Sequence, residues 1–177
     1  MKEFAKYLLV PAFLLFAGCS ESVKIPAVTG FDANRYMGTW YEIARLPNRF
    51  EKGMVEVSAA YSPRPGGGIK VVNNGVKNGE KISVTGVAYF AGKKDEGLLK
   101  VSFFRPFYGA YRIIKLSPDY RYSVVTGSDM SYLWILARSR ELPETELDGI
   151  MTFLRAHGFA VENLLWSWRP SEASASE

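Results

Sequence analysis

The sequence predicts an all-β fold: an eight-stranded antiparallel up-and-down β-barrel with one C-terminal α-helix packed against its outside. Between Trp40 and Arg138 the chain is a series of short segments of alternating polarity, separated by Gly, Pro, Asn and Asp turns. Such spacing is typical of a β-barrel or sandwich. Trp40 begins the first segment and Arg138 ends the last, and the first and last strands of a closed barrel are neighbours. A guanidinium over an indole there would contribute about 0.5–2 kcal/mol.

The eight strands are expected near 39–47, 55–62, 68–75, 81–91, 98–104, 110–116, 120–126 and 131–139. An eight-stranded barrel has an interior that can hold one small ligand. Because antiparallel strands reverse direction, the connections alternate between the two ends of the barrel. The turns expected at an open end are 48–54, 76–80, 105–109 and 127–130. The residues expected to meet at the closed end, which one indole plugs, are Gly38, Trp40, Asp119, Tyr120 and Arg138.

The direction of each side chain follows from the period of two along a strand. The residues expected to point into the barrel are Glu42, Ala44, Leu46, Val57, Ala59, Tyr61, Ile69, Val71, Asn73, Gly86, Ala88, Phe90, Leu99, Val101, Phe103, Tyr132, Trp134 and Leu136. This set mixes small residues with large aromatics. We interpret the small residues as room for a cavity, because a solid core would fill the space to crystal-like density. The alternative is a filled core in which Ala and Gly face Trp and Phe.

The helix is expected over 143–157, where four apolar residues form one stripe: Leu147, Ile150, Met151 and Leu154. Pro143 suits the first turn of this helix and Gly158 its end. A short closing strand is expected at 164–168.

Residues 1–18 are predicted to be a lipoprotein signal peptide. A basic start precedes an apolar run at 7–16 that is too short to span a membrane. A cysteine directly after Ala17-Gly18 indicates that Cys19 becomes the lipid-modified first residue. Phe16 stands where such a signal usually carries Leu, and the alternative is an ordinary secretory signal with an incidental cysteine. The further divisions expected are a lipidated tether at 19–30, the barrel domain at 31–170 and a flexible tail at 171–177.

Three motif regions of the lipocalin family have counterparts in this chain, in the same order and spacing. They are Gly38-Thr39-Trp40-Tyr41, Asp119-Tyr120 and Arg138. The chain therefore resembles the lipocalins, and more closely the bacterial, Blc-like outer-membrane lipoproteins, with which it also shares the character of 99–104, 106–109 and 132–136. Many lipocalins hold the C-terminal segment to the barrel with a disulfide. Cys19 is the only cysteine here, so this chain must hold its tail by packing.

The resemblance implies a location in the outer membrane of a Gram-negative bacterium, with a lipid anchor on Cys19 and the barrel facing the periplasm. Ser20 agrees with this, because it stands where an aspartate would retain a lipoprotein in the inner membrane. The implied ligand is a fatty acid or lysophospholipid, in maintenance of the cell envelope or its stress response. Several acyl chains together anchor a protein stably.

Enzyme chemistry finds little support in the sequence. The only histidine, His157, lies at the end of the predicted helix, and there is no His/Cys cluster for a metal. Glu42 is the one inward carboxylate, a group that a tyrosine or arginine usually satisfies. The net charge of +4 is too small and too dispersed to indicate a nucleic-acid partner. Haem as cargo is disfavoured, because no histidine is expected inside the barrel.

The sequence instead favours binding of a lipid in the barrel, with the acyl chain inside and the head group at the mouth. The residues expected to contact it are Trp134, Tyr108, Phe50, Phe90, Phe103, Val101, Leu99, Ala59, Tyr61, Val71, Glu42 and Tyr132. The residues expected near the head group are Arg49, Lys52 and Arg105. The alternative is a lipid-anchored interaction module without small-molecule cargo, whose aromatic loops bind a protein or a second copy in a homodimer.

Overall fold

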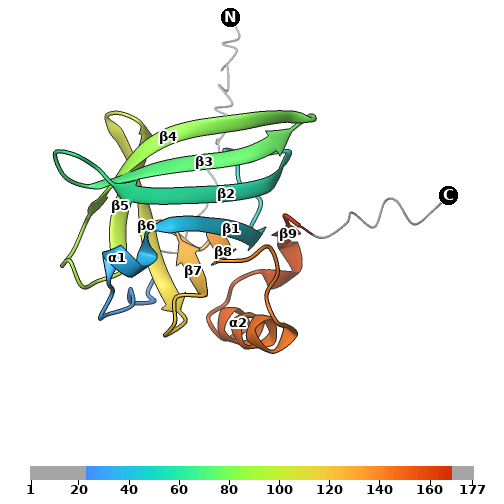
Figure 1. Ribbon diagram of the computed structural model, residues 1–177. Coiled ribbons are helices and arrows are strands. Elements are labelled where there is room, and N and C mark those ends of the chain that lie inside the picture. The colour runs from blue at the N-terminus through green and yellow to red at the C-terminus, as the bar shows by residue number, and fades with distance from the viewer. Residues whose placement is uncertain (1–22, 169–177) are drawn as a thin grey trace, which may run out of the picture.

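The computed structural model describes residues 23–168. The predicted signal peptide, Cys19 and the tail at 171–177 therefore lie outside the described residues. Figure 1 shows the barrel, with α2 lying against one side of it.

The barrel is closed by eight consecutive antiparallel strands, as predicted. They are β1 (Gly38–Arg45), β2 (Met54–Pro63), β3 (Ile69–Lys77), β4 (Glu80–Phe90), β5 (Leu98–Phe104), β6 (Phe107–Leu116), β7 (Tyr122–Thr126) and β8 (Leu133–Ala137). The other elements are α1 (Ala33–Tyr36), α2 (Glu144–Ala156), the 3-10 turn η1 (Val161–Asn163) and β9 (Leu165–Trp166). Closure follows from β1, which pairs with β2 on one side and with β8 on the other.

A β-bulge in β1 overturns part of the predicted facing. Glu42 pairs with Leu136, but the next pair is Ala44 with Ile135, so one residue of β1 is extra. An extra residue inverts the alternation of the residues that follow it. Ala44 and Leu46, which were expected inside, therefore pack in the apolar cluster outside the barrel, and Arg45 turns inward instead.

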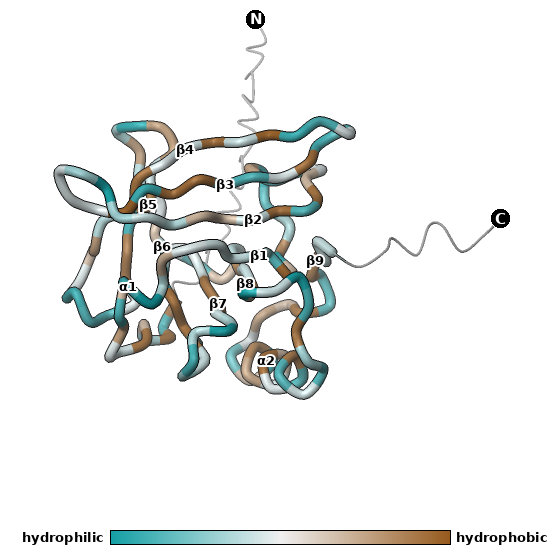
Figure 2. Tube along the Cα trace, in the orientation of Figure 1, coloured by the Kyte–Doolittle hydropathy of each residue, from teal (hydrophilic) through white to brown (hydrophobic). Residues whose placement is uncertain are grey.

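Two apolar clusters stabilise the fold, one inside the barrel and one between the barrel and α2. Figure 2 shows apolar segments both along the strands and along α2. The helix buries Ile150, Met151 and Leu154 against strand residues that include Val124 and Ile135. The predicted stripe and the predicted helix are thus confirmed, and the helix covers the outside of the barrel.

The C-terminal segment is held by main-chain hydrogen bonds and by ring contacts. β9 pairs with the end of β1, and beyond it the Ser167 N–H donates to the Ile43 carbonyl at 3.1 Å. The Ser167 carbonyl accepts from the Glu56 N–H on β2, so this segment joins β1 to β2 where their own pairing has ended. The Trp168 ring meets the edge of Tyr41 at 5.8 Å. Main-chain hydrogen bonds therefore hold this segment together with packing, whereas the sequence predicted packing alone.

Candidate ligand-binding site

The three sequence motifs meet at the closed end of the barrel. The Arg138 guanidinium lies 3.9 Å from the centre of the Trp40 ring, which is fully buried. The same guanidinium donates hydrogen bonds to the carbonyls of Thr39, Arg35 and Tyr120 at 3.0, 2.7 and 3.3 Å. Arg138 thus joins β8, β1, α1 and the β6–β7 turn, and the expected cation–π contact is present.

Gly38 and Tyr120 have the backbone conformations that this convergence requires. Gly38 has φ of +94°, and a Cβ there would lie 3.3 Å from Nη1 of Arg138. Tyr120 has φ of +63°, and its hydroxyl accepts from the Asp32 N–H at 2.8 Å. Asp119 pairs with the neighbouring Arg121 on the surface. These residues seal the base of the barrel and leave no opening for a ligand among themselves.

The plug of the barrel is an aromatic cluster, and the prediction of a single indole is wrong. The Tyr36 ring stacks 4.5 Å from Trp40 and lies 5.2 Å from Phe31 and 5.5 Å from Tyr61. The Tyr111 hydroxyl hydrogen-bonds those of Tyr36 and Tyr61 at 2.8 and 3.0 Å. The cause is the segment before β1, which folds under the barrel and adds Phe31 and Tyr36 to the core. The closed half of the interior is therefore filled.

The tyrosine hydroxyls in this cluster stay neutral. Burial raises the pKa of Tyr36 to about 12, although its hydrogen bonds with Ser123 and Tyr111 oppose the rise. Burial likewise raises the pKa of Tyr61 and Tyr111. The cluster is thus an uncharged floor that suits an apolar occupant above it.

Small inward residues leave less room than predicted. Ala59 stands opposite Trp40 in the β1–β2 pairing. A Cβ on Gly86 would lie 2.7 Å from the ring of Phe103, so that ring covers the glycine. At both positions the alternative of a filled core, with Ala and Gly facing large rings, is what the structure contains. The interpretation of small residues as a cavity is wrong there.

At the upper level of the barrel, some inward side chains keep part of their surface exposed. Phe103 is inward and 41% exposed, and two further inward side chains are half-buried: Val101 and Trp134. Phe90 lies instead at the closed end, opposite Leu99 and 6.4 Å from the Phe31 ring, so its predicted place beside the ligand is wrong. Four others of the predicted ligand contacts are buried in the filled half: Leu99, Ala59, Tyr61 and Val71. The predicted contacts are therefore divided between an accessible upper level and a closed lower level.

A row of aromatic rings leads from the surface into the barrel. Phe50, in the β1–β2 connection, is 67% exposed and lies 6.3 Å from Tyr132. Tyr132 stacks 6.0 Å from Trp134, which points inward from β8. Tyr108 does not belong to this row. It lies on the outer face of β6 beside Lys100 and Tyr89, because it is two positions from the outward Ala110. Its predicted place in the lumen is therefore wrong.

A buried polar cluster lies beside Trp134, and the sequence did not reveal it. Arg45, turned inward by the bulge, donates to the Glu42 carboxylate at 2.5 Å, and Ser167 donates to the same oxygen. The second oxygen of Glu42 is buried without a hydrogen-bond partner. Glu51 lies 3.8 Å from Arg45 and accepts from the Trp134 indole at 2.9 Å. The spacing of Glu42 and Arg45 was visible, but only the bulge brings both inside.

Arg45 also holds the β1–β2 connection in place. Its other terminal nitrogen donates to the carbonyls of Glu51 and Met54, each at 2.9 Å. Asn48 supports the same connection by donating to the Glu51 carboxylate at 2.7 Å. One buried guanidinium thus couples the wall of the barrel to a loop at its mouth.

Glu42 is expected to make stability depend on pH. Burial, and then the charge of Glu51, raise the pKa of Glu42 to about 7 and outweigh the lowering by Arg45 and Ser167. Between pH of about 4.5 and about 7, the folded protein keeps a proton that the unfolded chain has lost. The free energy of unfolding should therefore fall as pH rises through that window, by at most about 3 kcal/mol from this group.

Urea unfolding across this pH range checks the expectation. Glu42→Gln should flatten the decline relative to the wild-type protein, and Glu162→Gln, at an exposed position, should not. An unaltered slope in Glu42→Gln would contradict the assignment.

The three basic residues expected at the mouth are all exposed. Arg49 lies 4.8 Å from the Phe50 ring, Lys52 is two residues further along, and Arg105 lies in the β5–β6 turn. Two surface depressions, of about 580 and 530 Å³, lie outside the barrel. The first is bordered by 46–47, 130–131 and 160–165, and the second by 115–122 and 145–149.

Within residues 23–168, no group of His, Cys, Asp and Glu side chains could hold a metal ion. In the same range, no helix has the length and apolar character needed to cross a bilayer.

Comparison with known proteins decides the family. Residues 31–169 match the family model described as a lipocalin-like domain. The chain belongs to the lipocalin family. Proteins of this family are typically binding and transport proteins and not enzymes.

Bacterial relatives of this lipocalin match it over most of their length. It is 42% identical to outer membrane lipoprotein Blc of Citrobacter freundii over 166 residues, which cover 91% of this chain and 94% of the relative. It is 40% identical to outer membrane lipoprotein Blc of Vibrio cholerae over 164 residues, 89% of this chain and 95% of the relative. The resemblance to the Blc-like group is thus confirmed.

A solved structure agrees on the fold. Insecticyanin from the tobacco hornworm, Manduca sexta, superposes with a TM-score of 0.69 at 22% identity, over 87% of this chain and 88% of that one. At this identity the likeness concerns the barrel alone.

Proposed function

We propose that this lipocalin carries a fatty acid or lysophospholipid in the upper half of its barrel, in maintenance of the cell envelope or its stress response. It would be anchored through Cys19 to the outer membrane of a Gram-negative bacterium, facing the periplasm. The observation that carries the proposal is the set of partly exposed inward side chains at the upper level, Val101, Phe103 and Trp134, above a sealed aromatic base. The similarity to outer membrane lipoproteins supports the location.

A single alkyl chain suits this interior better than a broad ring system. The space left inside the barrel is shallow because Tyr36, Tyr61 and Tyr111 fill the closed half. It is also narrow, because the Phe103 ring lies over Gly86. Each methylene buried in such a space contributes about 0.8 kcal/mol, so a chain gains affinity step by step with its length. The uncharged tyrosine cluster at the closed end cannot pair with a charged lipid head group. The head group would therefore stay outside the barrel.

The head group would lie at the mouth, near Arg49, Lys52 and Arg105. All three side chains are exposed. Arg49 and Arg105 carry planar guanidinium groups, which can form paired hydrogen bonds with a carboxylate or a phosphate. Glu42 is already paired with Arg45, so it is a poor partner for an acid head group.

Lipid extracted from the protein purified out of its native envelope tests the proposal directly. A carrier should release about one acyl lipid per chain, measured by native mass spectrometry. Protein that is repeatedly free of lipid, and that binds none when it is added, would favour the alternative of an interaction module without cargo.

The fluorescence of Trp134 should respond to an acyl chain. Its indole is half-buried at the upper level and hydrogen-bonds Glu51. Palmitate or lysophosphatidylethanolamine should therefore shift the emission of the wild-type protein, and Trp134→Phe should lose most of the shift. An emission that stays constant at saturating lipid, as judged by a displacement assay, would remove Trp134 from the site.

Two matched arginine substitutions should show whether the ligand binds inside the barrel or on its outer surface. Val101→Arg places a charge in the accessible interior and should abolish acyl-chain binding. Val72→Arg places the same charge on β3 opposite Thr85, facing outward, and should leave binding intact. Equal affinities for the two variants would argue against binding inside the barrel.

A further inference from the structure

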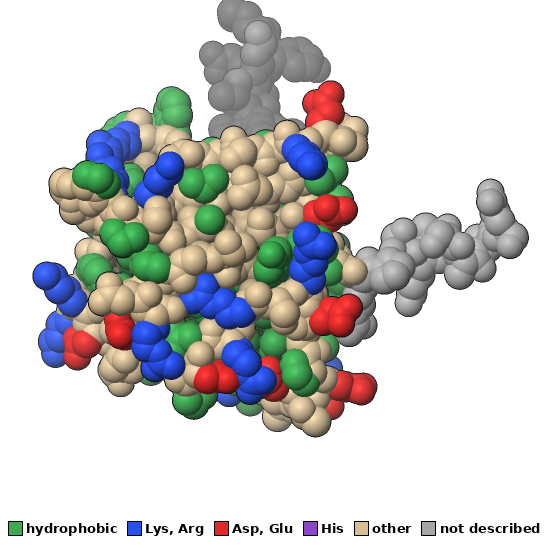
Figure 3. All heavy atoms as spheres, in the orientation of Figure 1, with side chains coloured by type: hydrophobic (Ala, Val, Ile, Leu, Met, Phe, Trp, Pro, Cys, Tyr) green, Lys and Arg blue, Asp and Glu red, His purple; other side chains and the backbone are tan. Residues whose placement is uncertain are grey.

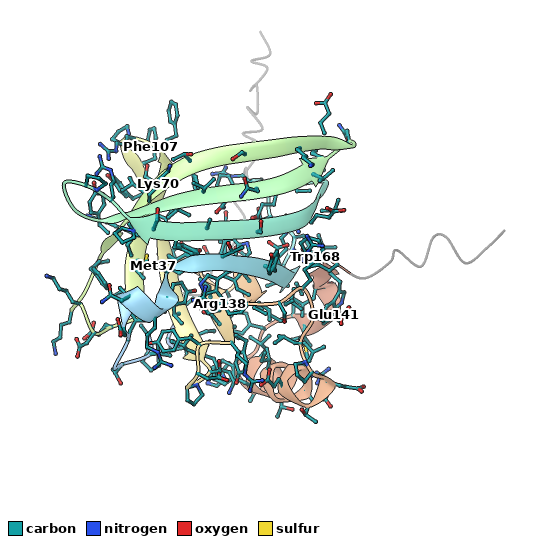
Figure 4. All side chains as sticks on the ribbon, in the orientation of Figure 1. Met37, Lys70, Phe107, Arg138, Glu141 and Trp168 are labelled. Atoms are coloured by element: carbon teal, nitrogen blue, oxygen red, sulfur yellow. The ribbon has the colours of Figure 1, made fainter. Side chains whose placement is uncertain are left out.

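The open end of the barrel carries an exposed aromatic surface. Phe50, Phe104 and Phe107 are 67, 76 and 71% exposed, and we call these three residues the aromatic rim. The rings of Phe104 and Phe107 stack 6.4 Å apart at the β5–β6 turn. In Figure 4, Phe107 projects from the molecule on the side opposite α2. Exposed rings of this size mark a contact surface on a soluble domain.

The large exposed hydrophobic side chains avoid the turns at the closed end. Within the described residues, none of the large exposed hydrophobic side chains lies in the closed-end turns at 63–68, 91–97 or 117–121. Those turns carry charged residues, Gly and Pro, among them Lys93, Lys94 and Asp95. The two ends of the barrel therefore differ in polarity, and only the open end suits an apolar partner.

Basic side chains surround the aromatic rim. Arg49 and Lys52 flank Phe50, and Arg105 lies between Phe104 and Phe107. Figure 3 shows Lys and Arg side chains beside hydrophobic ones at the upper left of the view, where Figure 4 labels Phe107 and Lys70. Aromatic rings that insert among acyl chains and cations that meet anionic head groups are the combination by which proteins bind a membrane surface.

The N-terminal segment climbs the outside of the barrel toward the open end. Phe31 hydrogen-bonds Asp95 in a closed-end turn, and Val28 bonds Gly97 and Ile113 further up. Ile25 follows, and its carbonyl accepts from the Arg112 side chain. Each step from Phe31 back to Ile25 thus moves along β6 away from the closed end, and Ile25 packs beside the apolar cluster that α2 covers.

Cys19 is close to this exit in sequence. Ile25 is six positions after Cys19, and a fully extended chain of that length spans at most about 20 Å. Acyl chains on Cys19 would therefore keep the barrel within that distance of the bilayer surface. A tether of that length, on a segment that runs along β6 from the closed end toward the open end, allows the open end to reach the membrane.

We propose that the open end of the barrel docks on the bilayer that holds the Cys19 acyl chains, with the aromatic rim inserted and Arg49, Lys52 and Arg105 on the head groups. This inference rests on the proposed anchor and deepens the proposed carrier function. The mouth would then open into the membrane, and a lipid could pass between bilayer and barrel without its acyl chain crossing water.

Spin labels on the full-length lipoprotein, reconstituted in vesicles of phosphatidylethanolamine and phosphatidylglycerol, test the orientation. A single cysteine replaces Phe107 at the open end or Lys94 at the closed end, and the nitroxide reports collisions with oxygen and with a water-soluble nickel chelate. The label at 107 should favour oxygen and the label at 94 should favour nickel. Equal, water-like behaviour at both positions, or the reverse order, would overturn the docking.

The mass of the intact protein shows whether Cys19 is acylated, and so distinguishes a wrong docking proposal from a wrong anchor proposal. Acylated Cys19 with a water-like label at 107 would overturn the docking alone, whereas unmodified Cys19 would overturn the anchor and the docking together. Strong dipolar coupling between two labels at 107 in detergent, without vesicles, would assign the rim to a second copy of the chain and also overturn the docking.

A rate measurement supplies a second, independent test. Phe104→Ser with Phe107→Ser should slow lipid uptake from vesicles about tenfold, because two rings no longer insert. Uptake of lipid supplied as monomers in water should not change. Val84→Ser, an exposed apolar position on the wall of β4, is the matched control and should slow neither. Loss of both uptake rates in the double variant would assign the rings to the lipid site itself and overturn their role in docking.

Discussion

Replacing Trp40 with alanine is expected to lower the free energy of unfolding by about 3–5 kcal/mol. The indole is fully buried, stacks on Tyr36 at 4.5 Å and lies under the Arg138 guanidinium at 3.9 Å. Its N–H donates to the Tyr36 carbonyl at 2.8 Å. Truncation therefore leaves a large cavity and removes a hydrogen bond at the point where β1, α1 and β8 meet. Urea unfolding monitored by circular dichroism measures the loss.

Two comparisons show whether the loss comes from the closed end. Phe104→Ala removes a ring that is 76% exposed and should change the free energy of unfolding by less than about 0.5 kcal/mol. A double-mutant cycle between Trp40→Phe and Arg138→Met should give a coupling of about 0.5–2 kcal/mol. A Trp40→Ala variant with the unfolding midpoint of the wild-type protein would remove this residue from the core.

Replacing Arg45 with methionine is expected to cost about 3–5 kcal/mol near pH 7. The guanidinium is buried, pairs with Glu42 and Glu51, and holds two carbonyls of the β1–β2 connection. Its loss leaves two carboxylates close together in the interior with no cation. The destabilisation should shrink toward pH 5, because protonation of Glu42 then removes the uncompensated charge.

Arg121→Met is the matched control for this variant. Arg121 also pairs with two carboxylates, those of Asp119 and Glu146, but it lies on the surface. Its replacement should leave the unfolding midpoint nearly unchanged, because water screens exposed pairs. Equal losses in the two variants, or a loss in Arg45→Met that does not depend on pH, would contradict the role given to the buried cluster.

Local patterns in the sequence were enough to predict most of the architecture. Alternating polarity between turn residues located all eight strands, and the stripe from Leu147 to Leu154 located α2. Alternation of the connections between two ends predicted that Trp40, Tyr120 and Arg138 would meet, and they do. These predictions succeed because each depends on residues that are near one another in the chain, or on a simple rule of strand direction.

The prediction of the interior was less successful, and particular residues show why. The bulge after Glu42 moved Ala44 and Leu46 outside and brought Arg45 inside. No residue type at that point of the sequence indicates a bulge. Tyr108 was assigned to the lumen from its aromatic character, although its strand position places it outside.

The sequence alone thus determined the number and order of the strands, the helix outside the barrel and the meeting of Trp40, Tyr120 and Arg138 at its base. Only the tertiary structure decided the depth of the interior. Depth depends on the segment around Phe31 folding under the barrel, on the Phe103 ring lying over Gly86 and on the register of β1 against β8. Such contacts join residues far apart in the chain, and a one-residue change of register inverts every side chain beyond it.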